Sequence, residues 1–212
     1  MRVVNARKTV LQAGLEALDI ALPESATEKL LVYIELLVKW NKTYNLTAIR
    51  NGDEMVTQHL LDSLAILPHL SDAKSLADIG SGAGLPGIPL AIARADLAMT
   101  LIDSVQKKSA FQQQARIALG LGNVSIYSGR IEDFKRHGEF DAVTARAFSD
   151  LTTLVQGAAP LLKTGGRIYA MKGVLPQDEI AVLPKDWKVV AAPRLRIPGL
   201  DAERHLLIVG KS

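Results

Sequence analysis

A glycine-rich segment, residues 78–87 (DIGSGAGLPG), holds the residue types best suited to bind a ligand. Three of its glycines stand at alternate positions, at Gly80, Gly82 and Gly84. Glycine lets the backbone approach a ligand closely and adopt a positive φ. An apolar run, residues 75–79, leads into the segment, and Pro86 and Pro89 suit the first turn of a following helix. The pattern predicts a strand, a tight loop and a helix, and in open α/β sheets ligands bind at the carboxyl ends of such strands.

Two carboxylates accompany this loop. Asp103 closes the next predicted strand, 19 residues after Gly84, where a carboxylate can accept hydrogen bonds from both hydroxyls of a ribose. Loop and acid together indicate an adenine nucleoside. The dinucleotide fingerprint needs Gly or Ala where this chain has Leu85, and Asp78 suits a cationic amino group better than a pyrophosphate. These features favour S-adenosylmethionine over NAD, and the alternative is an ordinary α/β turn that binds nothing.

The composition excludes several other kinds of site. The 212-residue chain has no cysteine, which excludes disulfides, iron–sulfur clusters, cysteine-ligated zinc and thiol nucleophiles. Its four histidines are scattered, so we expect no metal site. No stretch reaches the roughly 18 apolar residues of a membrane span. The amino-terminal residues also lack the apolar core of a signal peptide, and we expect a cytoplasmic protein.

The net charge of +3 is unevenly distributed. Residues 1–72 carry 7 basic and 9 acidic side chains, or −2, whereas residues 73–212 carry 18 and 13, or +5. A basic excess around the predicted ligand loop favours a polyanionic partner such as nucleic acid. Eight basic residues are candidates for a phosphate-binding surface, each with ordinary solvation as its alternative: Lys107, Lys108, Arg130, Lys135, Arg136, Lys172, Arg194 and Arg196.

The elements that position these residues fall into two parts. Residues 1–72 show helical periodicity, with Ser25 and Glu28 as a capping box, a polar loop at 41–51, and Asp53 as the cap of a further helix that ends at Pro68. We interpret this part as a helical cap. Residues 73–212 alternate strands and helices, which is typical of a wound α/β sheet. The predicted strands are 75–79, 98–102, 124–127, 140–145, 167–172, 187–193 and 204–209, and the last two are expected to pair as a hairpin.

Five motifs resemble the glucose-inhibited division protein B family, whose members are class I S-adenosylmethionine-dependent methyltransferases. They are NKTYNLT (41–47), HLLDS (59–63), DIGSGAGLPGIPL (78–90), RAF (146–148) and MKG (171–173). The resemblance runs from about residue 25 to the last predicted strand. It implies a Rossmann-like, seven-stranded, mostly parallel sheet of order 3-2-1-4-5-7-6 with helices on both faces. It also implies methylation of guanine N7 in 16S ribosomal RNA. The expected partner is 16S RNA or the small ribosomal subunit, and we expect the protein to be a monomer.

The resemblance carries the family's cofactor site onto particular residues of this chain: Gly80, Leu85, Ile131, Glu132 and Arg146. Ile131 would pack on the adenine, and the backbone at Ile131 and Glu132 would meet its polar edge. Arg146 would stand near the transferred methyl group. Read from the sequence alone, Ile131 is equally a core residue and Arg146 a surface ion-pairing residue.

Guanine N7 fits a chain without an obvious acid–base pair. N7 is an unprotonated acceptor, so no base has to remove a proton, and catalysis can rest on positioning. Arg146 would serve as a clamp and not as a base. N7 is hard to reach in an A-form helix, so we expect an unpaired target base. Phe148 is the candidate stacking platform, with Lys172 as a phosphate contact and His59 facing the methionine end of the cofactor. The rival functions are a small-molecule methyltransferase and a non-catalytic RNA-binding protein.

Overall fold

The computed structural model describes residues 2–148 and 150–212. Its centre is a seven-stranded sheet with the order β3-β2-β1-β4-β5-β7-β6. The strands are β1 (Ser75–Ile79), β2 (Ala98–Asp103), β3 (Val124–Ser128), β4 (Phe140–Arg146), β5 (Leu162–Lys172), β6 (Trp187–Ala191) and β7 (His205–Lys211). Strands β1 to β5 pair in parallel, whereas β7 is antiparallel to both β5 and β6. The expected strand order, and the hairpin of the last two strands, are confirmed.

Helices cover both faces of the sheet, as expected. Those that follow the strands are α5 (Gly87–Ala93), α6 (Gln106–Leu119), α7 (Leu151–Ala158) and α8 (Gln177–Ala181). Successive side chains of a strand point to opposite faces. Accordingly, Leu76 of β1 packs in a core shared with α5 and α6, whereas Ala77 packs in a second core with α7. The carboxyl ends of β1, β2 and β4 therefore lie together at one edge, between two helical layers.

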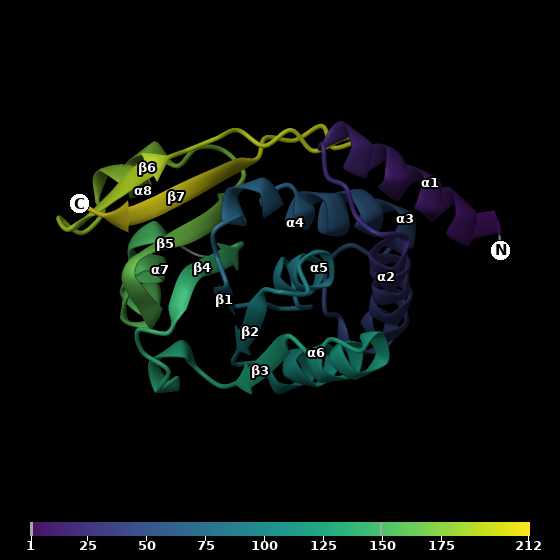
Figure 1. Ribbon diagram of the computed structural model, residues 1–212, viewed down its shortest axis with the longest axis horizontal. Helices are drawn as coiled ribbons and strands as arrows, with labels where there is room; N and C mark the ends of the chain where they lie inside the picture. The colour runs from purple at the N-terminus through teal and green to yellow at the C-terminus, as the bar shows by residue number, and fades with distance from the viewer. Residues whose placement is uncertain (1, 149) are drawn as a thin grey trace.

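The amino-terminal part is helical and packs on one face of the sheet (Figure 1). It contains α1 (Arg2–Ala17), α2 (Glu24–Tyr44), α3 (Gly52–Met55), a π-helical turn (Val56–Leu61) and α4 (Asp62–Leu64). Leu30, Leu37 and Leu60 from these helices are fully buried in the same core as Leu76 and Leu101 of the sheet. The division at residue 72 stays a prediction, because the helical part and the sheet share one hydrophobic core.

Three local expectations in the helical part are wrong. Helix α2 begins at Glu24 after an extended Pro23, whose fixed φ suits a helix start, so Ser25 lies inside the first turn and caps nothing. The helix also continues beyond Asn41 to Tyr44, because Asn41 is buried and its amide satisfies the backbone at Thr47 and Ile49. The next helix is capped by Asn51, whose side chain accepts from the Asp53 amide at 2.9 Å, and not by Asp53.

The connection from β6 to β7 runs across to the helical part (Figure 1). At Gly199 it lies against Thr57, since a Cβ on Gly199 would be 3.7 Å from the Thr57 hydroxyl. This crossing brings residues next to β7 beside the π-helical turn, although the two segments are far apart in sequence. Within the described residues, the helices are too short or too polar to cross a membrane.

Candidate functional site

The loop after β1 has the conformation that its glycines predict. Gly80, Gly82 and Gly84 all have positive φ values, of 65°, 59° and 84°. A side chain at Gly84 would also collide with Ile88, because a Cβ there would lie 2.3 Å from its Cδ1. The loop then leads directly into α5 at Gly87. Glycine is therefore required here for backbone conformation and for packing of the loop on the helix.

Asp103 at the end of β2 organises the loop and faces an open hollow. Its carboxylate accepts hydrogen bonds from the backbone amides of Gly82 and Val105, both at 2.8 Å. Lys108 places its ammonium 4.0 Å from the same carboxylate. Each carboxylate oxygen can accept more than one hydrogen bond, so Asp103 retains acceptor capacity toward the hollow.

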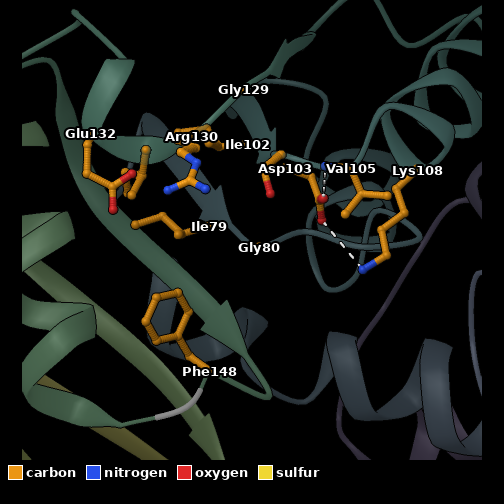
Figure 2. Close-up of a pocket in the computed structure, with 12 residues that line it drawn as sticks. Ile79, Gly80, Ile102, Asp103, Val105, Lys108, Gly129, Arg130, Glu132 and Phe148 are labelled. Carbon is orange, nitrogen blue, oxygen red and sulfur yellow. Dashed lines mark hydrogen bonds and ion pairs between the residues drawn. The ribbon is translucent and has the colours of Figure 1, made fainter.

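The hollow beside Asp103 has a volume of about 410 Å³ and lies at the carboxyl ends of β1 and β2. Figure 2 shows Asp103 and Lys108 on one side of it and Glu132 and Phe148 on the other. Among the predicted cofactor residues, those that line it are Gly80, Asp103, Ile131 and Glu132. We call this space the nucleoside hollow.

The remaining predicted loop residues lie behind the nucleoside hollow. Leu85 is buried in the core, and Gly84 packs on α5. Asp78 is fully buried: one carboxylate oxygen accepts from the Gly87 amide at 2.8 Å, and the other has no hydrogen-bond partner among the described residues. Burial raises the pKa of Asp78 to about 7, although the Gly87 amide and the positive charge of Arg146 oppose this rise. Asp78 is thus a buried acceptor that lacks one partner.

Arg146 belongs to a second hollow of about 350 Å³, on the other side of the turn that follows β4. We call it the cap hollow, because it lies between that turn and the amino-terminal helices. Its lining includes His59, Asp62, Arg146, Lys172, Gly173 and Arg204. Ala147 turns the chain with a positive φ of 56°, so that Arg146 lines the cap hollow and Phe148 lines the nucleoside hollow. Such strained residues cluster at functional sites.

A partly buried ion-pair network holds Arg146. Asp62, whose side chain is only 3% exposed, accepts from Nη1 of Arg146 at 3.2 Å and from Nε of Arg204 at 2.9 Å. The same Nη1 donates to the Gln58 carbonyl at 3.2 Å. Arg146 is therefore not the exposed surface ion pair that the sequence alone allowed. It is fixed between the helical cap, β4 and the approach to β7.

His59 lies in the π-helical turn and is neutral. Its Nδ1 donates to the Gln58 carbonyl at 3.0 Å, because a carbonyl can only accept, and Nε2 then accepts from the Thr47 hydroxyl at 2.9 Å. Burial, helped by the charge of Arg146, lowers the pKa of His59 to about 4. His59 lines the cap hollow and not the nucleoside hollow. Both ring nitrogens are occupied, which fits the alternative of a satisfied buried histidine.

Lys172 is already neutralised. Its ammonium lies 2.7 Å from the Glu179 carboxylate and 3.4 Å from the Phe148 carbonyl. Glu179 in turn accepts from the Leu151 amide at 2.7 Å. Lys172 thereby ties the Phe148 turn to α7 and α8. Its predicted phosphate contact is not tested by this geometry.

Residues 26–207 match the family model for rRNA small subunit methyltransferase G. The match covers most of the 212-residue chain. The chain belongs to the rRNA small subunit methyltransferase G family. The resemblance seen in the five motifs is thus confirmed.

Relatives in the rRNA small subunit methyltransferase G family match over nearly their full length. The chain is 52% identical over 201 residues to ribosomal RNA small subunit methyltransferase G of Azoarcus sp., covering 95% of each chain. It is 51% identical over 205 residues to the protein of that name from Neisseria meningitidis serogroup B, covering 97% of this chain and 99% of the other.

A solved structure outside that group shares the fold. It is 1,6-didemethyltoxoflavin-N1-methyltransferase from Burkholderia thailandensis with bound 1,6-didemethyltoxoflavin and S-adenosylhomocysteine. It has 14% identity, a TM-score of 0.59 and coverage of 85% of this chain and 89% of that one. The class I methyltransferase fold is thus confirmed.

Sequence reasoning missed Arg204 in the cap hollow and gave Asp62 no role of its own. Asp62 belongs to the HLLDS motif, but nothing in the local sequence shows that its partners are Arg146 and Arg204. Its spacing of three from His59 on a helix was the available signal. Among the described residues, no group of three His, Cys, Asp or Glu side chains is arranged to hold a metal.

The basic candidates separate into paired and unpaired groups. Arg136 pairs with Glu139 at 2.6 Å, and Arg194 lies 3.9 Å from Glu203. Four others have no acidic partner within 4.0 Å in the part of the chain that the structure describes: Lys107, Arg130, Lys135 and Arg196. Arg130 also lines the nucleoside hollow.

Proposed function

We propose that this chain transfers a methyl group from S-adenosylmethionine to N7 of a guanine in the 16S RNA of the small ribosomal subunit. The observation that carries the proposal is the pair of hollows on either side of the Arg146–Phe148 turn. One has the acceptor and glycine loop of a nucleoside site, and the other is lined by basic side chains. Family membership supports the reaction class and the RNA substrate.

The residues present fit S-adenosylmethionine. Asp103 keeps acceptor capacity in the nucleoside hollow for the ribose hydroxyls, and Ile131 offers an apolar surface for the adenine. The unpartnered oxygen of Asp78 is a buried acceptor suited to an ammonium group. S-adenosylmethionine, when bound, supplies an electrophilic methyl group on a sulfonium centre. Gly80 and Gly82 allow the backbone to approach that ligand, and Glu132 would meet the polar edge of the adenine.

The side chains of the cap hollow suit a methyl acceptor that needs no deprotonation. His59 is neutral, but its nitrogens are engaged with Gln58 and Thr47, and Asp62 is engaged by two arginines. Neither is free to take a proton. Guanine N7 attacks with a lone pair already exposed on its Hoogsteen edge. The chain then has to orient the base and exclude water, and such positioning can supply about 7–11 kcal/mol of a barrier.

Arg146 acts in this scheme as the catalytic clamp. The ring of Phe148 lies in the wall of the nucleoside hollow, as Figure 2 shows, so its stacking on the target base stays a prediction. The unpaired basic side chains Arg130 and Lys107 would contact RNA phosphates. We further propose that the protein acts as a monomer in the cytoplasm, which sedimentation and cell fractionation would test.

The experiment is transfer of labelled methyl from S-adenosylmethionine to intact small ribosomal subunits and to naked 16S RNA. We expect label in RNA from at least one of the two substrates. Label in neither would refute the proposal and favour a non-catalytic RNA-binding protein, whereas label in a small metabolite would favour the other rival. Calorimetry should show binding of S-adenosylmethionine and not of NAD, and binding of NAD alone would contradict the cofactor assignment.

A further inference from the structure

The cap hollow adjoins the nucleoside hollow, and the described side chains that line it leave hydrogen-bond donors unused. We propose that the cap hollow is the binding site of the target guanine, and that Arg146 selects this base by donating a hydrogen bond to its O6. This inference rests on the proposed function, because it assigns a place to the base in the same reaction. It adds a specificity role to Arg146 and a positioning role to Asp62.

The two hollows share a wall. The turn Arg146–Ala147–Phe148 contributes its first two residues to the cap hollow and its third to the nucleoside hollow. The charge of Arg146 lowers the pKa of His59 in the cap hollow and also acts on Asp78 behind the glycine loop. Arg146 therefore stands between the two spaces. A base in the cap hollow would reach this wall without displacing the glycine loop.

The donors of Arg146 match the Hoogsteen edge of guanine. Its Nη1 is used by Asp62 and Gln58, whereas Nε and Nη2 make no hydrogen bond to the described residues. Guanine presents two neighbouring acceptors, O6 and N7, and N7 must stay free for the methyl group. O6 is thus the acceptor left for the guanidinium. Adenine carries an amino donor at the corresponding position, which would face the Arg146 donors and leave them unpaired.

Asp62 fixes the orientation in which those donors are presented. It is nearly fully buried, and its two oxygens are divided between Arg146 and Arg204. Arg204 lies in the β6–β7 connection, Asp62 in the helical cap and Arg146 at the end of β4. Contacts among these three parts of the chain therefore fix the orientation of the Arg146 guanidinium. With Lys172 neutralised by Glu179, the two arginines and Asp62 leave the lining with a net positive charge, which favours a nucleotide.

The closing experiment fills the cap hollow. Gly173 lines it, and a Cβ there would have only one neighbouring atom within 4 Å, the Glu203 carbonyl oxygen at 3.8 Å. Gly173→Leu therefore fits the backbone while occupying the space. The matched control is Gly122→Leu, in the exposed turn between α6 and β3, where a Cβ would meet nothing within 4 Å.

We expect Gly173→Leu to lower kcat/KM for small subunits by about a hundredfold, because a base displaced from its productive position reacts that much more slowly. The Kd for S-adenosylmethionine should stay within about twofold of the wild-type value, and Gly122→Leu should change neither quantity. Wild-type kcat/KM in Gly173→Leu would overturn the inference. Equal losses of transfer and of cofactor binding would also overturn it, because the cap hollow would then belong to the cofactor. If the wild-type protein itself labels no RNA, the proposed function fails instead.

The O6 contact has its own measurement. Once the target position is mapped, subunits can be reconstituted with inosine or adenine there. Inosine keeps O6 and N7, so its methylation should remain within about threefold of guanine, whereas adenine should fall by at least about tenfold. In Arg146→Lys this discrimination should shrink. Equal methylation of adenine and guanine, or unchanged discrimination in Arg146→Lys, would contradict the reading of O6 by Arg146.

Discussion

Asp62→Asn is the substitution whose consequences the structure defines best. The carboxylate side chain is 3% exposed and makes charge-assisted contacts of 2.9 and 3.2 Å to arginines that are themselves 28% and 22% exposed. Hydrogen bonds to charged groups contribute about 1.5–3 kcal/mol each. Asparagine keeps one acceptor oxygen, and water can reach the exposed parts of both arginines. We therefore expect the free energy of unfolding to fall by about 2 kcal/mol. For a domain of this size that lowers Tm by about 4–8 °C.

The same substitution should lower turnover. Without the carboxylate, Arg146 loses the partner that orients it, and we expect kcat for small subunits to fall by about tenfold or more. The Kd for S-adenosylmethionine should stay within about twofold, because Asp62 does not line the nucleoside hollow. Thermal unfolding, calorimetry and steady-state transfer measure the three quantities.

The control is Asp53→Asn, which removes an exposed carboxylate of the amino-terminal helical part that pairs with Arg7 at 2.6 Å. This substitution should lower the free energy of unfolding by at most about 1 kcal/mol and leave kcat unchanged. If Asp62→Asn has the Tm and the kcat of the wild-type protein, the proposed positioning of Arg146 by Asp62 is refuted. It is also refuted if Asp53→Asn lowers Tm and kcat as much as Asp62→Asn does.

Three further predictions concern the two hollows. Asp103→Ala should weaken S-adenosylmethionine binding, because it removes the ribose acceptor and releases the Gly82 amide. Arg146→Ala should mainly lower turnover. If calorimetry shows that both substitutions weaken cofactor binding equally and turnover is otherwise unchanged, these roles are contradicted. The pKa of Asp78 is raised to about 7, so its carboxyl group holds a proton more tightly in the folded state than in the unfolded state. The contribution of Asp78 to the free energy of unfolding therefore falls as the pH rises from about 4 to 7. The Tm of Asp78→Asn relative to wild type should therefore increase between pH 5 and 8, and a constant difference would argue against a buried, protonatable Asp78. The pKa of His59 is lowered to about 4, so this group's stabilising contribution is lost as the pH falls from about 6.5 to 4. Its ring proton shifts in NMR spectra should stay constant from pH 8 to 5.5, and a midpoint near 6.5 would show that the ring is exposed.

Local chemistry explains why so much of the sheet was predictable from the sequence. Strands β1 and β4 are short apolar runs between polar turns, and the glycines of the loop occupy positions where only their backbone freedom fits. Asp103 was identifiable because the end of a strand and its spacing from the loop are both local features. The helix starts were harder, because Pro23 and Asn51 compete as caps with equally plausible neighbours at Ser25 and Asp53.

The composition of the cap hollow depends on contacts that no local pattern encodes. Asp62 and Arg204 are separated by 142 positions and meet only because the β6–β7 connection crosses to the helical cap. The direction of the Arg146 side chain depends on the positive φ of Ala147, a conformation that alanine rarely adopts. Sequence reasoning placed Arg146 near the transferred methyl group, and this role stays a prediction. The structure adds that the Arg146 side chain lines the cap hollow, which the local sequence does not reveal.

The identity of the methylated atom tests the central claim most directly. Small subunits treated with the protein and S-adenosylmethionine would be digested to nucleosides and analysed by mass spectrometry against methylated guanosine standards. We predict that the added methyl group is recovered as 7-methylguanosine from a single position of 16S RNA. Recovery of another methylated nucleoside, with no gain in 7-methylguanosine, would contradict the account.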